Sequence, residues 1–363
     1  MNHKKVIVGM SGGVDSSVAA LLLKKQGYEV VGVTMQIWQD EETSIQEENG
    51  GCCGLSAVDD ARRVASQLDI PYYVMNFKNE FKEWVMDDFA EEYFRGRTPN
   101  PCIRCNRYVK WEALLHRAVS IGGDYIATGH YAKVVRLENG RYTLKKAPSR
   151  KDQTYALYNL TQEQLSRTLM PDGDYTKEEI RQMAEEAGLL VASKPDSQDI
   201  CFIPDGNYQK FLYEYTGKRL PKGNFVDKSG KVLGIHEGIT HYTIGQRKGL
   251  NLAMGHPVFV SEIRPETNEV VIGDSRDVFK SLLTARQVNW MSIPEPEPGE
   301  TIRVQAKVRY AHQGAMATVW TEKDGSLVCQ FDEPQRAITP GQALVMYDGE
   351  YVVGGGVIET VKD

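Results

Sequence analysis

The chain has 363 residues, of which 41% are hydrophobic and 25% charged, and its formal net charge is −6. This length predicts two or three domains with a sizeable core, and the composition is that of an ordinary soluble protein. The acidic balance argues against a generally basic nucleic-acid-binding surface but not against local basic patches. With no apolar run of about eighteen residues and no signal-like start, we expect a cytoplasmic enzyme without a membrane partner.

The first elements are a short buried strand at residues 6–8 and a helix with an apolar face at residues 18–23. Ser11, Gly12 and Gly13 turn the chain between them. Glycines let the backbone approach a ligand, and the first N–H groups of a helix attract anions. The stretch therefore predicts an anion site. It has neither the lysine of a Walker A loop nor the G-x-G-x-x-G of a dinucleotide fold.

The string Ser11-Gly-Gly-Val-Asp-Ser16 resembles the PP-loop of the N-type ATP pyrophosphatases. That resemblance implies binding of the pyrophosphate end of ATP and cleavage between the α- and β-phosphates. The products would be an adenylated substrate and free pyrophosphate. The alternative is a tight strand-to-helix turn with Asp15 and Ser16 near the helix N-terminus.

Strands and helices then alternate, with strands expected at 29–35, 71–76 and 124–128 and helices at 56–68, 80–94, 109–119 and 176–188. The last of these helices begins with Thr176-Lys-Glu-Glu179, which matches a capping box. This alternation predicts an α/β fold with a doubly wound parallel sheet. Ligands of such sheets bind at the carboxyl ends of the strands. Residues 9–17, Met35 and Gly129 should therefore share one rim.

From residue 216 onward glycine is frequent and the segments become short and β-like. A hairpin is expected from residues 259–263 and 269–272, and further strands at 301–309, 315–321, 327–331 and 343–347 suggest a small β-barrel. We predict three domains: a PP-loop catalytic domain at 1–205, a β-rich adapter at 206–280 and a C-terminal β-barrel at 281–363.

The six cysteines are not expected to form a structural disulfide framework in a reducing cytoplasm. Cys102 and Cys105 form a C-x-x-C at a helix start beside Arg104, where positive charge favours thiolates. Half of a zinc site, completed by Cys52 and Cys53, is the alternative. Cys201 alone could be a buried apolar residue, and Cys329 is expected in the core.

An ATP site that adenylates a carbonyl oxygen, combined with cysteines in two separate polar segments, suggests sulfur transfer. A persulfide on one cysteine would supply the sulfur, and the second cysteine would resolve the covalent state by thiol–disulfide exchange. Two windows without acids, residues 95–110 and 141–151, are candidate phosphate-binding surfaces, although solvated basic loops would look the same.

Eight stretches in order resemble the bacterial tRNA-specific 2-thiouridylase family over nearly the whole chain: GMSGGVDSS, TPNPCIRCN, ATGHYAK, KDQTYAL, SKPDSQDICFI, HYTIGQRKGL, KVRYAHQ and TPGQALVMY. The resemblance implies that ATP adenylates the C2 oxygen of the wobble uridine of tRNA. Cys201 would carry a persulfide delivered by a sulfur carrier protein or cysteine desulfurase, and Cys105 would be the other catalytic cysteine. The C-terminal barrel would bind tRNA.

The resemblance also implies individual contacts. ATP would contact Gly9, Met10, Ser11, Gly12, Gly13, Val14, Asp15, Ser16, Met35 and Gly129. The target base would meet Asn100, Pro101 and Cys102, and tRNA would contact His130, Lys151, Asp152, Gln153, Arg309, Tyr310 and Gln342. Mg²⁺ would accompany ATP, although the sequence shows no dedicated metal cage.

Many members of that family have an aspartate where this chain has Cys102. Cys102, Cys105 and Cys201 could therefore hold an iron–sulfur cluster with one open iron, a minority hypothesis beside a spare redox thiol. Two rival functions differ in class. One is a PP-loop synthetase that adds an amine without sulfur chemistry, and the other is a non-catalytic, nucleotide-dependent RNA-binding protein.

Overall fold

The computed structural model describes residues 4–37, 55–195 and 200–362. Cys52 and Cys53 lie outside the described residues. The chain divides into two compact units. The first comprises residues 1–86, 101–206 and 350–352, and the second comprises residues 87–100, 207–349 and 353–363. Among the described helices, none is both long and apolar enough to cross a bilayer.

The first unit is built on a parallel sheet, as predicted. Its strands are β1 (Lys5–Gly9), β2 (Glu29–Gln36), β3 (Tyr72–Asn76), β4 (Tyr125–Ala127) and β7 (Thr168–Leu169). Their spatial order is β3-β2-β1-β4-β7, and every neighbouring pair is parallel. The chain moves outward from β1 to β3 and then returns to the other side of β1 at β4. This reversal makes the carboxyl ends of β1 and β4 the topological switch point of the sheet, and the crevice at such a point is where α/β folds bind ligands.

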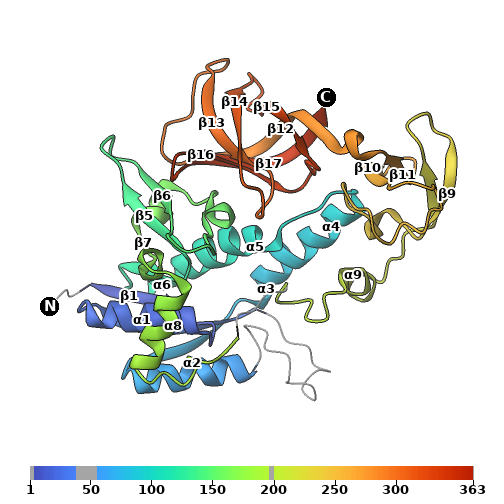
Figure 1. The fold of residues 1–363 in the computed structure, drawn as a ribbon. Helices are drawn as coiled ribbons and strands as arrows, with labels where there is room; N and C mark the ends of the chain where they lie inside the picture. The colour runs from blue at the N-terminus through green and yellow to red at the C-terminus, as the bar shows by residue number, and fades with distance from the viewer. Residues whose placement is uncertain (1–3, 38–54, 196–199, 363) are drawn as a thin grey trace. The chain divides into compact units, whose positions relative to one another are not determined.

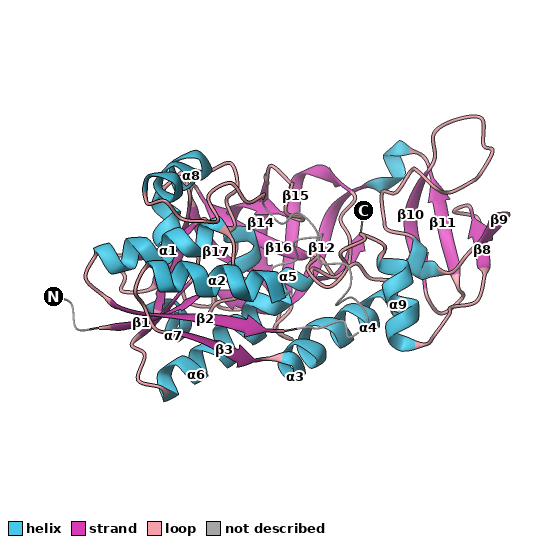
Figure 2. Ribbon diagram, turned by 90° about the horizontal axis from the view of Figure 1, so that it is seen from below, coloured by secondary structure: helices cyan, strands magenta, loops and turns pink. Residues whose placement is uncertain are grey.

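Helices cover both faces of this sheet, which confirms the doubly wound arrangement. Figure 2 shows α1 (Val14–Lys25), α2 (Leu55–Gln67) and α8 (Lys177–Glu186) on one side of the strands and α6 (Leu115–Ser120) on the other. Val6 and Val8 of β1 are buried in the same hydrophobic cluster as apolar residues of α1, α2 and α8. The alternate residue Ile7 is also buried. A strand that is covered on both faces reads as a continuous apolar run, which is why β1 was recognisable.

Two helical runs follow β3 in the sequence. The first contains α3 (Lys78–Phe81), a π-helical segment (Lys82–Asp87) and α4 (Asp88–Phe94). The second contains α5 (Pro101–Arg104) and a π-helical segment (Cys105–Leu114), and it continues into α6. Proline at the first position of α5 suits a helix start because its missing N–H is not needed there. Cys102 and Cys105 therefore lie within a helix rather than in a loop before one.

The β5–β6 hairpin was not predicted. β5 (Ala132–Arg136) pairs antiparallel with β6 (Tyr142–Lys146). β6 lies inside the window 141–151, which the sequence analysis gave as a candidate phosphate-binding surface or a solvated basic loop. Thr143 donates a hydrogen bond to the Val352 carbonyl (2.6 Å), and Lys145 is ion-paired with Glu350 (3.1 Å). These partners are about two hundred residues away, but the hairpin pairing itself is local, and Asn139-Gly140 between the two strands is a turn signal that the sequence analysis did not use.

Between this hairpin and α8 the chain forms short elements. They are a 3₁₀ turn (Thr154–Leu157), α7 (Gln162–Ser166) and a 3₁₀ turn (Pro171–Asp174). The capping box predicted at the start of α8 is present. Thr176 and Glu179 cap each other, with Glu179 accepting from the Thr176 amide at 2.7 Å.

The second unit contains α4, α9 (Tyr208–Thr216) and a four-stranded sheet. The sheet order is β10-β11-β8-β9, formed by β10 (Phe259–Arg264), β11 (Glu269–Gly273), β8 (Gly223–Val226) and β9 (Val232–His236). β10 and β11 form the antiparallel hairpin expected from the sequence.

The C-terminal part is a closed barrel, drawn in orange to red in Figure 1. Its strands are β12 (Phe279–Trp290), β13 (Ile302–Lys307), β14 (Ala315–Thr321), β15 (Leu327–Arg336), β16 (Ala343–Asp348) and β17 (Tyr351–Lys362). β12 pairs with both β15 and β17, which closes the ring. Cys329 is fully buried in this core, as expected.

Neither β12 nor β17 was predicted. β17 contains Gly354, where a Cβ would lie 2.2 Å from the Asn289 carbonyl oxygen of β12. Glycine in this strand allows the two backbones to approach closely at the closure of the barrel.

Candidate functional site

The turn after β1 can only be made by glycine at its second position. Gly12 has φ +70°, and a Cβ there would lie 2.3 Å from the carbonyl oxygen of Ala57. Serine side chains tie the turn together. Ser16 accepts a hydrogen bond from the Ser11 amide (3.1 Å), and Ser17 donates to the Gly13 carbonyl (2.8 Å). The backbone of the loop is thus fixed before any ligand arrives.

The N-terminus of α1 has the form of an anion site. The N-cap is Gly13, and it makes no side-chain capping hydrogen bond. The first helical N–H groups therefore receive no side-chain acceptor from the cap and can meet an anion instead. This geometry fits the predicted phosphate contacts from Ser11 to Ser16.

The other predicted nucleotide residues lie at the same end of the sheet. A Cβ on Gly129, just beyond β4, would lie 2.5 Å from the carbonyl carbon of Asp15 and 2.6 Å from the Ser16 nitrogen. Met10 is anchored to β2, donating its amide to Val33 (2.8 Å). Met35 lies two residues farther along β2. The structure therefore brings the turn and Gly129 into contact at the crevice.

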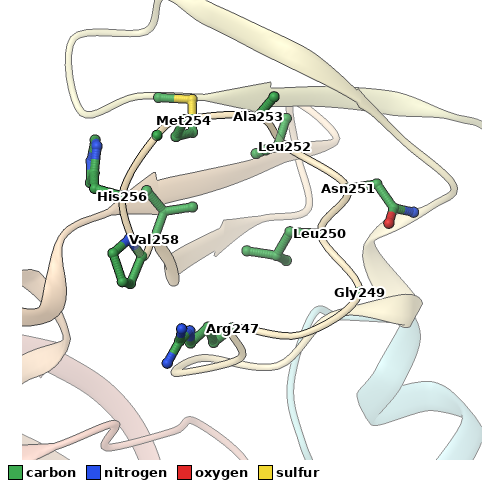
Figure 3. Close-up of a pocket in the computed structure, with 11 residues that line it drawn as sticks. Arg247, Gly249, Leu250, Asn251, Leu252, Ala253, Met254, His256 and Val258 are labelled. Carbon is green, nitrogen blue, oxygen red and sulfur yellow. The ribbon is translucent and has the colours of Figure 1, made fainter.

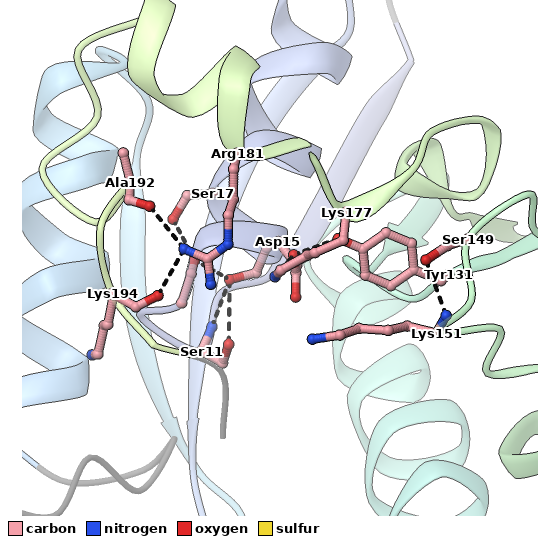
Figure 4. A network of polar contacts seen from close by, with 12 residues as sticks. Ser11, Asp15, Ser17, Tyr131, Ser149, Lys151, Lys177, Arg181, Ala192 and Lys194 are labelled. Carbon is pink, nitrogen blue, oxygen red and sulfur yellow. Dashed lines mark hydrogen bonds and ion pairs between the residues drawn. The ribbon is translucent and has the colours of Figure 1, made fainter. Parts of the chain in front are cut away.

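Asp15 is the centre of a polar network that the sequence analysis missed (Figure 4). Its Oδ1 accepts a hydrogen bond from the Tyr131 hydroxyl (2.7 Å) and forms an ion pair with the Lys177 ammonium (2.5 Å). Nearby, Lys194 donates to the Gly12 carbonyl (3.1 Å) and to Asp60 (2.8 Å). The first-turn position of Lys177 in α8 was visible in the sequence, but its proximity to Asp15 was not.

His130 is half-buried beside the crevice and is kept neutral. Its Nδ1 lies 2.8 Å from the Thr128 hydroxyl oxygen, and its ring is 5.6 Å from that of Trp111. Burial, followed by the positive charge of Lys110, lowers the pKa of His130 well below its usual range. A neutral imidazole can donate or accept a hydrogen bond but offers no charge to a phosphate.

The predicted tRNA-contact residues Lys151, Asp152 and Gln153 form a braced loop. Asp152 accepts from the Thr154 hydroxyl (2.7 Å), and Gln153 accepts from the Tyr131 amide (2.8 Å) through its side chain. Lys151 is exposed, and Figure 4 shows its side chain extending toward Asp15. Two of the three side chains therefore shape the loop, whereas Lys151 offers charge at its surface. Contact of these residues with tRNA stays a prediction.

The cysteine pair lies on the helical run that starts at Pro101. Cys102 is exposed and Cys105 is half-buried. One turn farther, Tyr108 stacks on Trp84 (4.5 Å between ring centroids), with the Arg104 guanidinium 4.8 Å from the Tyr108 ring. The positive surroundings expected around the C-x-x-C are therefore present.

Cys201 is half-buried in a turn just after the undescribed residues 196–199. The adjacent Phe202 packs edge-on against Phe81 of α3, with 5.6 Å between ring centroids. α3 in turn contacts the helical segment that begins at Cys105. The two predicted catalytic cysteines thus lie on segments that share α3 as a neighbour.

The described residues do not form a metal cage. No group of three or more His, Cys, Asp or Glu among them could hold a metal ion. Cys102, Cys105 and Cys201 are all described, so these three thiols do not fit the iron–sulfur hypothesis in this structure. Cys52 and Cys53, the other half of the zinc alternative, lie in the part that the structure leaves undescribed.

The remaining predicted tRNA contacts belong to the second unit. Arg309 donates to the Arg336 carbonyl (2.8 Å), and Tyr310 is 48% exposed. Gln342 donates to the Thr98 carbonyl (2.8 Å), and the Thr98 amide donates to Pro340 (2.9 Å). Gln342 therefore anchors the segment leading to Asn100.

A pocket of about 650 Å³ lies in the same unit (Figure 3). It is lined by Arg247 and residues 249–258, a loop that follows the HYTIGQRKGL stretch. Leu250 and Val258 point to its inside. None of the residues predicted from the sequence to bind ATP or tRNA lines it.

Family models match three consecutive parts of the chain. Residues 4–205 match the model described as "tRNA methyl transferase HUP domain". Residues 209–274 match "tRNA methyl transferase PRC-barrel domain", and residues 280–358 match "Aminomethyltransferase beta-barrel domain". A solved 4-thiouridine synthetase–RNA complex with bound ATP is 17% identical, covering 59% of this chain and 50% of its own, with a TM-score of 0.34. That likeness is too weak to support a conclusion.

The relatives of known name match the whole chain. The tRNA-specific 2-thiouridylase MnmA of Lachnoclostridium phytofermentans is 65% identical over 356 residues, which cover 98% of this chain and 99% of the relative. The protein of the same name from Acetivibrio thermocellus is 56% identical over 361 residues, covering 99% of this chain and 100% of the relative. With a parallel sheet, a PP-loop and a C-terminal barrel in place, the chain belongs to the tRNA-specific 2-thiouridylase family.

Proposed function

We propose that this protein replaces the C2 oxygen of the wobble uridine of tRNA with sulfur, at the expense of ATP. The observation that carries the proposal is the fixed glycine turn at the sheet's crevice, in a chain 65% identical to a named 2-thiouridylase. tRNA and a persulfide donor, either a sulfur carrier protein or a cysteine desulfurase, would be its partners. We infer that it acts in the cytoplasm.

The first step is adenylation. The turn and the first N–H groups of α1 hold the phosphates of ATP, with Met35 and Gly129 near the nucleoside. The uracil C2 oxygen attacks the α-phosphorus, and pyrophosphate leaves. The carbonyl oxygen thereby becomes part of an AMP leaving group. Since the described residues offer no metal cage, Mg²⁺ would be held mainly by the phosphates and water.

The second step transfers sulfur. The terminal sulfur of a Cys201 persulfide attacks C2, and AMP leaves with the oxygen. The Cys105 thiolate then attacks the Sγ of Cys201 and breaks the sulfur–sulfur bond, so that the base keeps the sulfur. A disulfide between Cys105 and Cys201 remains, and an external thiol must reduce it before the next cycle.

The RNA would be positioned by phosphate contacts and read at a flipped base. Asn100, Pro101 and Cys102 are the proposed contacts of the base. His130, Lys151, Asp152, Gln153, Arg309, Tyr310 and Gln342 are the proposed contacts of tRNA. The three-domain division at 1–205, 206–280 and 281–363 remains part of the proposal.

The two steps can be separated with a cysteine variant. Cys201→Ser should still release pyrophosphate from ATP and form adenylated tRNA when unmodified tRNA is present, because the adenylation step does not use the Cys201 thiol. It should form no 2-thiouridine, because the persulfide has no attachment point. Pyrophosphate release and nucleoside mass analysis measure the two outcomes.

Cys329→Ala is the control, since Cys329 lies in the core of the C-terminal barrel and has no role in the proposed transfer. It should retain both steps. Full thiolation by Cys201→Ser would overturn the assigned role of Cys201. Activity without both Cys105 and Cys201 would favour a synthetase without sulfur chemistry. No tRNA-dependent pyrophosphate release from the unmodified protein would favour a non-catalytic RNA-binding protein.

A further inference from the structure

The glycine turn has no cation of its own for the phosphates of ATP. The stretch from Gly9 to Ser17 contains no Lys or Arg, and its one charged side chain is Asp15. A triphosphate placed at the α1 N-terminus would therefore meet a carboxylate of the same sign. Backbone N–H groups and the Mg²⁺ that would accompany ATP offset part of that repulsion, and a cation from elsewhere in the fold would offset more of it.

Lys177 supplies such a charge at the right place. Its ammonium lies 2.5 Å from the Asp15 Oδ1, although the side chain is only 8% exposed. It comes from the first turn of α8, which the Thr176–Glu179 capping box holds in place. Its ammonium also lies 5.9 Å from the centre of the Tyr131 ring. Burying an ammonium costs free energy unless it is paired, so the ion pair with Asp15 is what allows Lys177 to be buried at this place.

A second carboxyl group, that of Asp172, lies near Lys177 in addition to Asp15. Asp172 is fully buried, and neither of its carboxyl oxygens has a hydrogen-bond partner within the described structure. Burial, followed by the charge of Asp15, raises the pKa of Asp172 well above its usual range. A neutral Asp172 leaves the Lys177 charge to be shared between Asp15 and a ligand at the turn.

Two of the other cations near the turn have structural tasks. Lys194 bridges the Gly12 carbonyl and the Asp60 carboxylate. Arg181 donates to the carbonyl oxygens of Ala192 (3.1 Å) and Lys194 (3.2 Å). Both fasten the segment after α8 to the fold, and Figure 4 shows the two hydrogen bonds of Arg181.

We propose that Lys177 is the residue that binds the pyrophosphate part of ATP, with Asp15 and Tyr131 holding its ammonium at the glycine turn. The proposal rests on the proposed function for the presence of ATP in this crevice. It assigns the role of the missing loop lysine to a residue far away in the sequence. Asp15 then acts as the anchor of the cation rather than as a direct phosphate ligand.

The test is equilibrium binding of ATP, pyrophosphate and AMP to the full chain by calorimetry. Lys177→Met should weaken ATP and pyrophosphate binding by about 10- to 100-fold, the range expected for a lost hydrogen bond to a charged group. AMP, which lacks the pyrophosphate, should bind within about threefold of the unmodified protein. Lys177→Arg keeps the charge and should lose less than Lys177→Met.

Lys25→Met is the matched control. Lys25 is exposed in the last turn of α1, on the same helix as Asp15 but about 15 Å along its axis. It should leave ATP binding unchanged. Thermal unfolding checks that each variant is folded, and Lys177→Gln replaces Lys177→Met if the latter does not fold.

Three results would overturn the inference: ATP binding to folded Lys177→Met within twofold of normal, an equal loss in Lys25→Met, or an equal loss of AMP binding. If the unmodified protein thiolates tRNA while Lys177→Met binds ATP normally, only this inference fails. If ATP binding depends on Lys177 but tRNA is not thiolated, the proposed function fails and the phosphate-binding role of Lys177 stands.

Discussion

Asp172 shows how a single buried group near the site responds to pH. In the unfolded chain its carboxyl loses its proton near pH 4. In the folded protein burial raises the pKa, so the proton is retained to higher pH. Folding therefore carries a penalty that grows as the pH rises above about 4 and levels off above the folded pKa.

Replacing this group should remove the penalty. We expect Asp172→Asn to be more stable than the unmodified protein at pH 8, by about 1–3 kcal/mol, and closer to it at pH 5. Urea unfolding at the two pH values measures the difference. A stability difference that is the same at both values would show that Asp172 is not protonated in the fold.

At the level of elements, the site depends on how β1, the glycine turn and α1 meet neighbouring backbone. The turn contacts α2 at Ala57, and α1 contacts the end of β4 at Gly129. These contacts are between main-chain atoms, so they leave no room for adjustment by rotamers. The geometry of the anion site should therefore be sensitive to one added methyl group.

Gly12→Ala is the direct test of that sensitivity. The variant combines a positive φ with a Cβ 2.3 Å from a carbonyl oxygen. We expect it to be destabilised by more than about 2 kcal/mol and to bind ATP at least tenfold more weakly. Urea unfolding and ATP titration measure these effects.

Gly122→Ala is the control because Gly122 has φ +79° but no atom within 4 Å of an added Cβ. It should cost only about 1–2 kcal/mol and leave ATP binding unchanged. If the two variants lose the same stability, the close approach of Ala57 is unimportant.

For the whole molecule, the sequence predicted elements whose signal is local. The apolar strands of the sheet, the capping box of α8 and the β10–β11 hairpin are present as expected. β12 and β17 were missed because their partners lie far along the chain. The β5–β6 hairpin was missed although its pairing is local. The family was recognisable because several motifs occur in order.

The candidate site likewise has one part that was predictable from the sequence and one part that was not. The glycine turn was predictable because its motif is contiguous. The pair of Asp15 and Lys177 was not, because the two residues are 162 positions apart and meet only when α8 packs on α1. The predicted contacts of ATP and tRNA remain predictions, supported by the crevice and by the exposed Lys151.

Charge at the surface of the first unit should contribute to RNA binding. Arg150 and Lys151 are both exposed beside the braced loop. Reversing both charges should weaken tRNA binding and reduce the dependence of affinity on salt concentration, because fewer counterions are released. Titrations at several salt concentrations measure both quantities. Lys25→Glu is the control, and an unchanged affinity and slope in the double variant would exclude these residues from the interface.

The most direct test of the account is chemical. The full chain is incubated with ATP, unmodified tRNA, and a cysteine desulfurase with its cysteine substrate as the persulfide donor, and the wobble nucleoside is analysed by mass spectrometry. We predict 2-thiouridine at that position, formed only when ATP is present. An unmodified uridine after ATP has been consumed, or sulfur incorporated without ATP, would contradict the account.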